Sequence, residues 1–321
     1  MKRPLSAGLD IAWTCRKHDM TSVIHKIDLL TFHGPMNKIS ISIPKLLFSI
    51  RRQTPIAALI LITACTGGTE LLDEDQLGQD IDIAAATASA DLYLIIGQSN
   101  SAGRDINFDP AGADTPSSEV LLFTDGNTFE TATQPLNRYS GVRNTNIEQG
   151  VHLGLEFAKA MHLKNGRQVF LVANSRGGTK VAEWRKDRDT GYFENTVQRV
   201  KDAESACACT LTGILWHQGE GNVSSDGSYT SSYFSSLEGL IEEYRNELGD
   251  VPFLTGQLFR TAKNWNFNKD LSQVDDADFG TSDVDWVTSL NLTTFDGTHF
   301  DAASMRNFGG RYAAVMQKFV D

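Results

Sequence analysis

Short apolar runs alternate with segments of helical periodicity from residue 91 to the end of the chain. The runs are rich in β-branched and aromatic residues and show no polar alternation, which is typical of strands buried on both faces of a parallel sheet. Four such runs occupy residues 91–96, 168–173, 211–216 and 251–255.

Three segments beside these runs have the pattern of amphipathic helices. Two of them end at a glycine and repeat apolar residues at helical spacing, namely Leu153, Phe157, Ala160 and Met161 before Gly166, and Leu237, Leu240, Ile241 and Tyr244 before Gly249. The third spans 301–320, where Asp301 is placed to cap it and Gly309-Gly310 costs roughly 1 kcal/mol per glycine. This alternation predicts a parallel sheet with helices on both faces and functional loops at the carboxyl ends of its strands.

The N-terminal region has the pattern of a secretory signal. Basic residues precede the apolar segment 55–65, which is too short to span a bilayer. Its last four residues, Ile62-Thr63-Ala64-Cys65, resemble a bacterial lipobox, which predicts that Cys65 becomes the lipidated first residue of the mature chain. A generic signal peptide with an incidental cysteine is the alternative. We therefore expect residues 1–64 to be a removed leader, while Met1, Met20 and Met36 all remain possible starts.

Composition and charge limit the functions that residues 65–321 can have. Residues 65–90 are polar and acidic and read as a flexible tether, and 91–321 has the length of one α/β domain. The whole chain carries a formal net charge of −11, and without residues 1–64 it retains 20 Lys/Arg against 37 Asp/Glu, a net −17. Such a field repels nucleic acid, so we expect no nucleic-acid partner.

The cysteines of the expected domain give no metal-binding pattern. Cys207 and Cys209 are separated by one residue, and no cluster of further Cys or His ligands follows. Two buried free thiols are the favoured interpretation, with a local disulfide as the alternative in an oxidising compartment. We expect neither a metal nor a cofactor.

A candidate nucleophile and its partners occur at opposite ends of the domain. Ser99 follows the first apolar run just beyond Gly97, where an open α/β sheet presents its chemistry. The turn Asp296-Gly297-Thr298-His299 places a carboxylate and an imidazole three residues apart. A serine alone is more often a helix cap, and this turn alone is more often solvated. In the chain order Ser, Asp, His they predict acyl transfer by an activated hydroxyl.

Two further segments follow the second and third apolar runs. Gly177-Gly178 lies at a strand-to-helix turn, where a backbone N–H can point toward a substrate. Gln218 could donate its side-chain amide to an oxyanion, and Glu220 is either a second carboxylate of the site or a surface glutamate. His217 is expected to pack beside the site, and Trp184 is equally compatible with the core and with the wall of a sugar pocket.

Together these segments resemble the blocks of a known superfamily. Gly97-Gln98-Ser99-Asn100, Gly177-Gly178-Thr179, Gln218-Gly219-Glu220 and Asp296-Gly297-Thr298-His299 are similar to blocks of the SGNH (GDSL-type) hydrolases. The similarity is to the branch of sialate O-acetylesterases and carbohydrate esterase family six acetylxylan esterases. The resemblance implies a three-layer α/β/α sandwich of flavodoxin type, no metal, and removal of acetyl groups from sugar hydroxyls.

The resemblance also implies a role for each residue. Ser99 would be the nucleophile, His299 the base and Asp296 the group that orients it. The oxyanion donors would be the N–H groups of Ser99 and Gly177, with Gly178 as the close rival, and the amide of Gln218. Glu220 would be a secondary participant that assists the histidine.

The resulting hypothesis is a carbohydrate O-acetylesterase acting on an acetylated oligo- or polysaccharide. It would be lipid-anchored through Cys65 at the cell envelope, in an outer membrane and facing the periplasm or the outside, with secretion as the alternative. A lipase or thioesterase of the same superfamily and a catalytically inactive glycan-binding lipoprotein are the competing functions.

Overall fold

The computed structural model describes residues 90–275 and 279–320. The expected leader 1–64, the lipidation site Cys65 and the expected tether apart from Ala90 lie outside these residues, so they stay predictions. Within the described part of the chain, no helix combines the length and the apolar character needed to cross a membrane.

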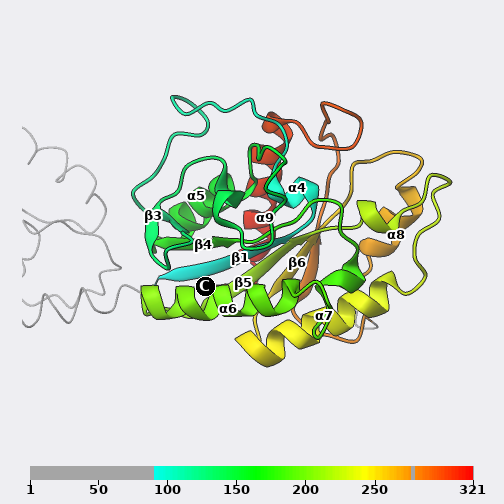
Figure 1. Ribbon diagram of the computed structural model, residues 1–321. Helices are drawn as coiled ribbons and strands as arrows, with labels where there is room; N and C mark the ends of the chain where they lie inside the picture. The colour runs from blue at the N-terminus through cyan, green and yellow to red at the C-terminus, as the bar shows by residue number, and fades with distance from the viewer. Residues whose placement is uncertain (1–89, 276–278, 321) are drawn as a thin grey trace, which may run out of the picture. The chain divides into compact units, whose positions relative to one another are not determined.

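A seven-stranded sheet forms the middle of the described domain (Figure 1). Its strand order is β3-β2-β4-β1-β5-β6-β7, and neighbouring strands are parallel except for β2 and β3. The strands are β1 (Asp91–Gly97), β2 (Val120–Phe123), β3 (Phe129–Thr131), β4 (Val169–Ala173), β5 (Leu211–His217), β6 (Phe253–Gly256) and β7 (Val284–Val287). The four predicted apolar runs are β1, β4, β5 and β6.

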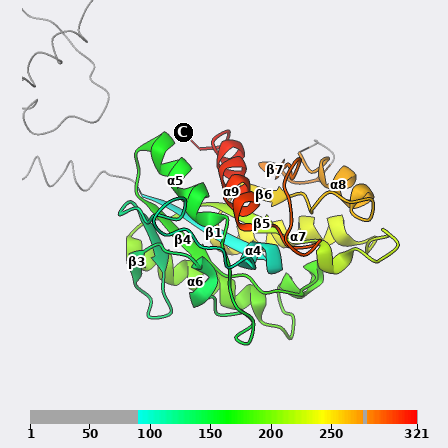
Figure 2. The same cartoon turned by 90° about the horizontal axis from the view of Figure 1, so that it is seen from above.

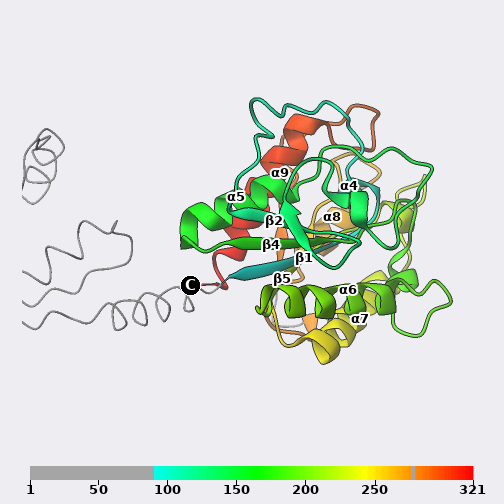
Figure 3. The same cartoon turned by 60° about the vertical axis from the view of Figure 1, so that its left-hand side comes forward.

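Helices cover both faces of this sheet. The helices α5 (Gly154–Asn165) and α9 (Ala302–Met316) pack together on one face, and α6 (Tyr192–Cys207) and α7 (Tyr233–Leu248) lie on the other (Figure 3). Shorter helices are α4 (Ser99–Ala102), α8 (Trp265–Leu271) and the 3-10 turns η1 (Leu136–Tyr139), η2 (Val181–Trp184) and η3 (Glu220–Asn222). This arrangement confirms the predicted three-layer α/β/α sandwich.

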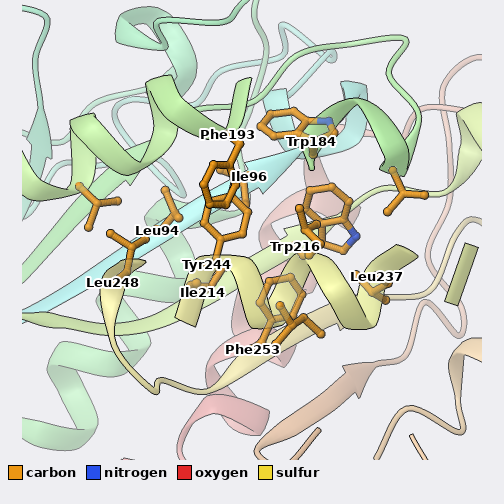
Figure 4. Packing of buried hydrophobic residues seen from close by; sticks show 14 of the residues in the cluster. Leu94, Ile96, Trp184, Phe193, Ile214, Trp216, Leu237, Tyr244, Leu248 and Phe253 are labelled. Carbon is orange, nitrogen blue, oxygen red and sulfur yellow. The ribbon is translucent and has the colours of Figure 1, made fainter. Parts of the chain in front are cut away.

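The burial of β1 explains why its sequence shows no polar alternation. Successive side chains of a strand point to opposite faces, and here both faces are covered. Leu94 and Ile96 pack in the cluster under α6 and α7, where Trp216 also lies (Figure 4). Tyr93 packs on the other face, with its ring 4.8 Å from that of Phe157 in an edge-to-face contact. Full burial of a side chain of this size stabilises the fold by roughly 1.5–3 kcal/mol.

Packing explains one of the two glycines in helix α9, because Gly309 lies against a neighbouring backbone. A Cβ on Gly309 would lie only 2.2 Å from the carbonyl oxygen of Leu153, just before α5. Gly310 has open space around its Cα, so only Gly309 is required by packing. Asp301 caps the helix as expected, because its carboxylate accepts the N–H of Ser304 at 2.8 Å.

The structure corrects the favoured interpretation of the two cysteines. Cys207 and Cys209 are not free thiols but form a disulfide at the end of α6. The chain turns between them because Ala208 adopts a left-handed conformation with φ of 50°. The alternative of a local disulfide was therefore the right one.

Candidate active site

The turn after β1 positions Ser99. Gly97 has a φ of 137°, and a Cβ there would lie 2.1 Å from the carbonyl oxygen of His217 in β5. Only glycine allows the two central strands to approach this closely while the chain leaves the sheet. Ser99 then begins α4 at the carboxyl end of β1 (Figure 2), and the residue is 7% exposed.

The turn that contains Asp296 and His299 meets Ser99 directly. The Nε2 atom of His299 lies 3.0 Å from Oγ of Ser99, and its Nδ1 atom lies 2.6 Å from Oδ2 of Asp296. The other carboxylate oxygen accepts the N–H groups of Thr298 and His299, at 2.9 and 2.7 Å. The structure thus brings together three predicted side chains that are separated by almost the whole domain.

The hydrogen bonds of Asp296 keep its carboxylate ionised and set which nitrogen of His299 carries a proton. Burial by itself would raise the pKa of Asp296, but hydrogen bonds from the backbone and side chain of His299 and from the N–H of Thr298 outweigh it and lower the pKa. An ionised Asp296 accepts the Nδ1 proton, which leaves Nε2 free to accept the hydroxyl proton of Ser99.

Glu220 is part of the site and not a surface residue. Its side chain is 11% exposed, and its Oε1 atom accepts a hydrogen bond of 2.5 Å from the amide of Asn100. The same oxygen lies 3.4 Å from Nε2 of His217. The ring of His217 is enclosed by Phe300 and Phe308, so this histidine packs beside the site as expected.

The surroundings of Glu220 act on its pKa in opposite directions. Burial alone would raise the pKa, but the neighbouring imidazole of His217 and the hydrogen bond from the amide of Asn100 lower it below its ordinary value of 4.5. The carboxylate therefore stays ionised beside Asn100.

The backbone N–H groups of Gly177 and Gly178 differ in whether they already donate a hydrogen bond. The N–H of Gly177 donates to Oδ1 of Asn144 at 3.0 Å. The N–H groups of Gly178 and Ser99 make no hydrogen bond to any described residue. Of the expected oxyanion donors, Ser99 and the rival Gly178 are thus the two with unused backbone hydrogens.

The amide of Gln218 is engaged inside the protein. The residue is fully buried, and its Nε2 lies near three acceptors, which are Oε1 of Gln98, the carbonyl of Thr179 and Oδ1 of Asn222, at 3.0, 2.9 and 2.9 Å. An amide nitrogen has two hydrogens, so none remains for a substrate oxygen unless one of these bonds is exchanged.

The side-chain amide of Gln98 has hydrogens free to donate. From the sequence, we expected this of Gln218. Its Oε1 accepts from Gln218 and from the N–H of Gly221 at 3.0 Å, which fixes the orientation of the side chain. Its Nε2 makes no hydrogen bond within residues 90–275 and 279–320, although the residue is only 3% exposed. The signal that could have identified it is its place next to Ser99.

Trp184, which the sequence left between the core and a sugar pocket, and His152 are both fully buried. Trp184 is fully buried against Trp216 and donates its indole N–H to Oγ1 of Thr179 at 2.9 Å, so it belongs to the core. Burial lowers the pKa of His152 to about 3, and its Nδ1 accepts the N–H of Gly154. Across the part of the chain that the structure describes, no group of three or more His, Cys, Asp and Glu side chains could hold a metal ion.

Comparison with known proteins agrees with this geometry. Residues 89–318 match the model of the family described as carbohydrate esterase, sialic acid-specific acetylesterase. The chain belongs to this family. The expectation of an esterase among the carbohydrate acetylesterases is therefore confirmed.

Solved structures show the same fold at low sequence identity. A protein from Arabidopsis thaliana is 22% identical with a TM-score of 0.61, and the match covers 71% of this chain and 98% of that one. A carbohydrate acetylesterase from Xanthomonas citri is 17% identical with a TM-score of 0.53, and the match covers 71% of this chain but only 56% of that protein. Among curated proteins, no sequence matches this chain.

Proposed function

We propose that this carbohydrate esterase removes O-acetyl groups from sugars through an acetyl-enzyme on Ser99. The observation that carries the proposal is the 3.0 Å contact between Ser99 and His299, with Asp296 on the far nitrogen of the imidazole. Oγ of Ser99 attacks the acetyl carbonyl while His299 takes its proton, and His299 then protonates the departing sugar oxygen. Water attacks the acetyl-enzyme by the same route and releases acetate.

The negative charge that forms on the carbonyl oxygen requires hydrogen-bond donors. We propose the N–H groups of Ser99 and Gly178 and the amide of Gln98, because these donors have no acceptor among the described residues. Gly177 can replace Gly178 only by releasing Asn144. Gln218 then acts as a positioning residue, since it holds Gln98 in place.

The substrate is an acetylated oligo- or polysaccharide of the acetylxylan or sialoside type. Acetate release from acetylated xylan, pectin and sialosides tests this proposal, with a Ser99→Ala variant as the control. Comparing 4-nitrophenyl acetate with the octanoyl ester separates an acetylesterase from a lipase. The proposal fails if no acetylated glycan is hydrolysed faster by the wild type than by Ser99→Ala.

We further propose that the enzyme acts at the cell envelope, anchored by a lipid on Cys65. The apolar segment 55–65 and its lipobox-like end support this, and the disulfide between Cys207 and Cys209 fits an oxidising compartment. Replacing Cys65 by serine should move the protein from the membrane fraction to the soluble fraction of the producing cells. Equal membrane association of both forms would contradict the anchor.

A further inference from the structure

An open cavity of about 420 Å³ lies beside Arg176, the residue before Gly177. Arg143 and Val142 line it from the loop before α5, and Arg176 lines it from the loop after β4. The first turn of α6 contributes Tyr192 and Asn195. None of these residues takes part in the acyl transfer described above.

A single buried side chain holds the walls of this cavity together. Asn174 is fully buried at the carboxyl end of β4. Its Oδ1 accepts the hydroxyl of Ser140 at 3.0 Å and the N–H of Gly141 at 2.8 Å, while its Nδ2 donates to Oδ1 of Asn195 at 3.1 Å. The loop before α5 and the start of α6 are therefore fixed relative to each other, and the cavity is a built feature of the fold.

The two arginines of the cavity have no carboxylate partner. Arg176 donates to the carbonyls of Val142 and Arg143, and its guanidinium lies 5.5 Å from the centre of the Tyr192 ring. The side chain of Arg143 makes no hydrogen bond or ion pair to any described residue. Of the twelve arginines in residues 90–275 and 279–320, five pair with a carboxylate, and seven, including Arg143 and Arg176, do not. Arg143 and Arg176 therefore bring two positive charges to a cavity whose lining contains no Asp or Glu.

The start of α6, which lines the cavity through Gly191, Tyr192 and Asn195, has free backbone donors. The N–H groups of Tyr192, Phe193 and Glu194 make no hydrogen bond within the described ranges, and Gly191 before them has no side chain to cap the helix. A helix N-terminus carries partial positive charge and favours an anion. Together with two guanidiniums that lack a carboxylate partner, it favours a negatively charged group.

The cavity and the proposed catalytic centre share a wall. The N–H of Arg176 donates to the carbonyl of Gly97 at 3.0 Å, two residues before Ser99. Asn144, which follows Arg143, accepts the N–H of Gly177. On the other side of this turn lies Arg104, since a Cβ on Gly177 would come within 2.3 Å of its Nη2 atom.

We propose that this cavity binds the carboxylate of an acidic sugar unit next to the acetylated sugar of the substrate. The planar fork of a guanidinium matches the two oxygens of a carboxylate, and an uncompensated arginine is suited to accept one. This inference rests on the proposed deacetylation of a glycan and adds that the glycan is anionic. A uronic acid branch and a sialic acid both present this carboxylate.

Binding to a Ser99→Ala variant tests the inference without turnover. Isothermal titration calorimetry would compare xylotriose carrying one glucuronic acid, sialyllactose and neutral xylotetraose. We expect at least one acidic probe to bind about tenfold tighter than the neutral one, since charge-assisted hydrogen bonds are about twice as strong as neutral ones. The acidic probe that binds tighter identifies the source of the carboxylate.

A matched pair of arginine variants assigns the effect to the cavity. In the Ser99→Ala background, Arg143→Gln should weaken binding of the acidic probe about tenfold. Arg188→Gln should leave it unchanged, because Arg188 is an exposed arginine outside the cavity lining. Arg143 makes no internal hydrogen bond through its side chain, so its replacement removes no contact of the fold.

Two results would overturn the inference. One is the absence of any preference for an acidic probe, including no binding of any probe, and the other is equal binding by Arg143→Gln and Arg188→Gln. Either result leaves the proposed function intact if the wild type still releases acetate. Conversely, failure to release acetate from any glycan refutes the proposed function and leaves the binding measurements as they are.

Discussion

The amide of Asn100 donates to the carboxylate of Glu220 at 2.5 Å, one residue along the chain from Ser99. The same side chain donates to the carbonyl of Thr298 at 3.2 Å and accepts the N–H of Phe300 at 2.9 Å. Since Thr298 and Phe300 flank His299, Asn100 ties the loop of the imidazole to the short helix that carries Ser99. Glu220, in turn, orients Asn100.

Removing the hydrogen bonds of the Asn100 side chain should reduce turnover more than substrate binding. We expect Asn100→Ala to lower kcat about 10–100-fold with a small change in KM, because a displacement near 1 Å can cost about 10²-fold. Asn146→Ala is the control, since Asn146 is exposed and makes no hydrogen bond within the described ranges. Steady-state kinetics with 4-nitrophenyl acetate measure both variants. Equal kcat values for Asn100→Ala and Asn146→Ala would show that Asn100 does not position Ser99 and His299.

The lowered pKa of Glu220 makes its contribution to stability dependent on pH. A carboxylate whose pKa is lower in the folded state stabilises the fold above its unfolded pKa, and this contribution is lost as the pH falls through the lowered value. Glu220→Gln should therefore reduce the free energy of unfolding at pH 7 by about 1–3 kcal/mol. The difference from the wild type should shrink as the pH falls below 4.5.

Urea unfolding at a series of pH values measures this difference. Glu148→Gln is the matched control, because Glu148 is exposed and makes no hydrogen bond to a described residue. A difference for Glu220→Gln that grows toward acid pH would have the opposite sign and would refute this account of the pKa.

Gln98 and Gln218 should behave as one unit in catalysis. Loss of one oxyanion donor typically lowers kcat by ~10²–10³-fold, which we expect for Gln98→Ala. Gln218→Ala should also give a slow enzyme, because Gln98 loses the donor that orients it. The double variant should be no slower than Gln98→Ala alone, since both changes remove the same interaction. Losses in kcat that multiply in the double variant would assign an independent donor role to Gln218.

The two glycines of α9 provide a test of the packing between helices. Gly309→Ala should reduce the free energy of unfolding by about 1–3 kcal/mol, because its Cβ would meet the carbonyl of Leu153. Gly310→Ala should raise it by up to about 1 kcal/mol, because the site is exposed and alanine favours the helix. Chemical unfolding of both variants measures the contrast. Equal effects of the two substitutions would mean that α9 does not pack closely on the chain before α5.

Burial on both faces made the central strands predictable from sequence. β1 is buried at every position and β5 at every position except Thr212, so both strands appear as largely apolar runs. The outer strands β3 and β7 have only three and four residues, and Asp285 in β7 pairs with Lys318. Such short strands with charged side chains give no comparable signal, because too few consecutive apolar residues mark them in the sequence.

The site was predictable to the extent that its residues lie at strand ends. Ser99, Gly177 and Gln218 follow β1, β4 and β5, whose carboxyl ends meet at one edge of the sheet. The division of roles between Gln98 and Gln218 could not be predicted, because it depends on three acceptors that surround the buried amide of Gln218. Nor could the pairing of Asn144 with Gly177, which joins loops from different parts of the chain.

In the proposed reaction, Ser99 carries the acetyl group between the departure of the sugar and the attack of water. Rapid quenching of the wild type with 4-nitrophenyl acetate, followed by peptide mass spectrometry, tests it most directly. We expect an added acetyl mass on the peptide that contains Ser99, no such mass in Ser99→Ala, and a rate for that variant lower by at least about 10³-fold. Acetate release by Ser99→Ala within tenfold of the wild-type rate, or turnover with the acetyl group on another residue, would contradict it.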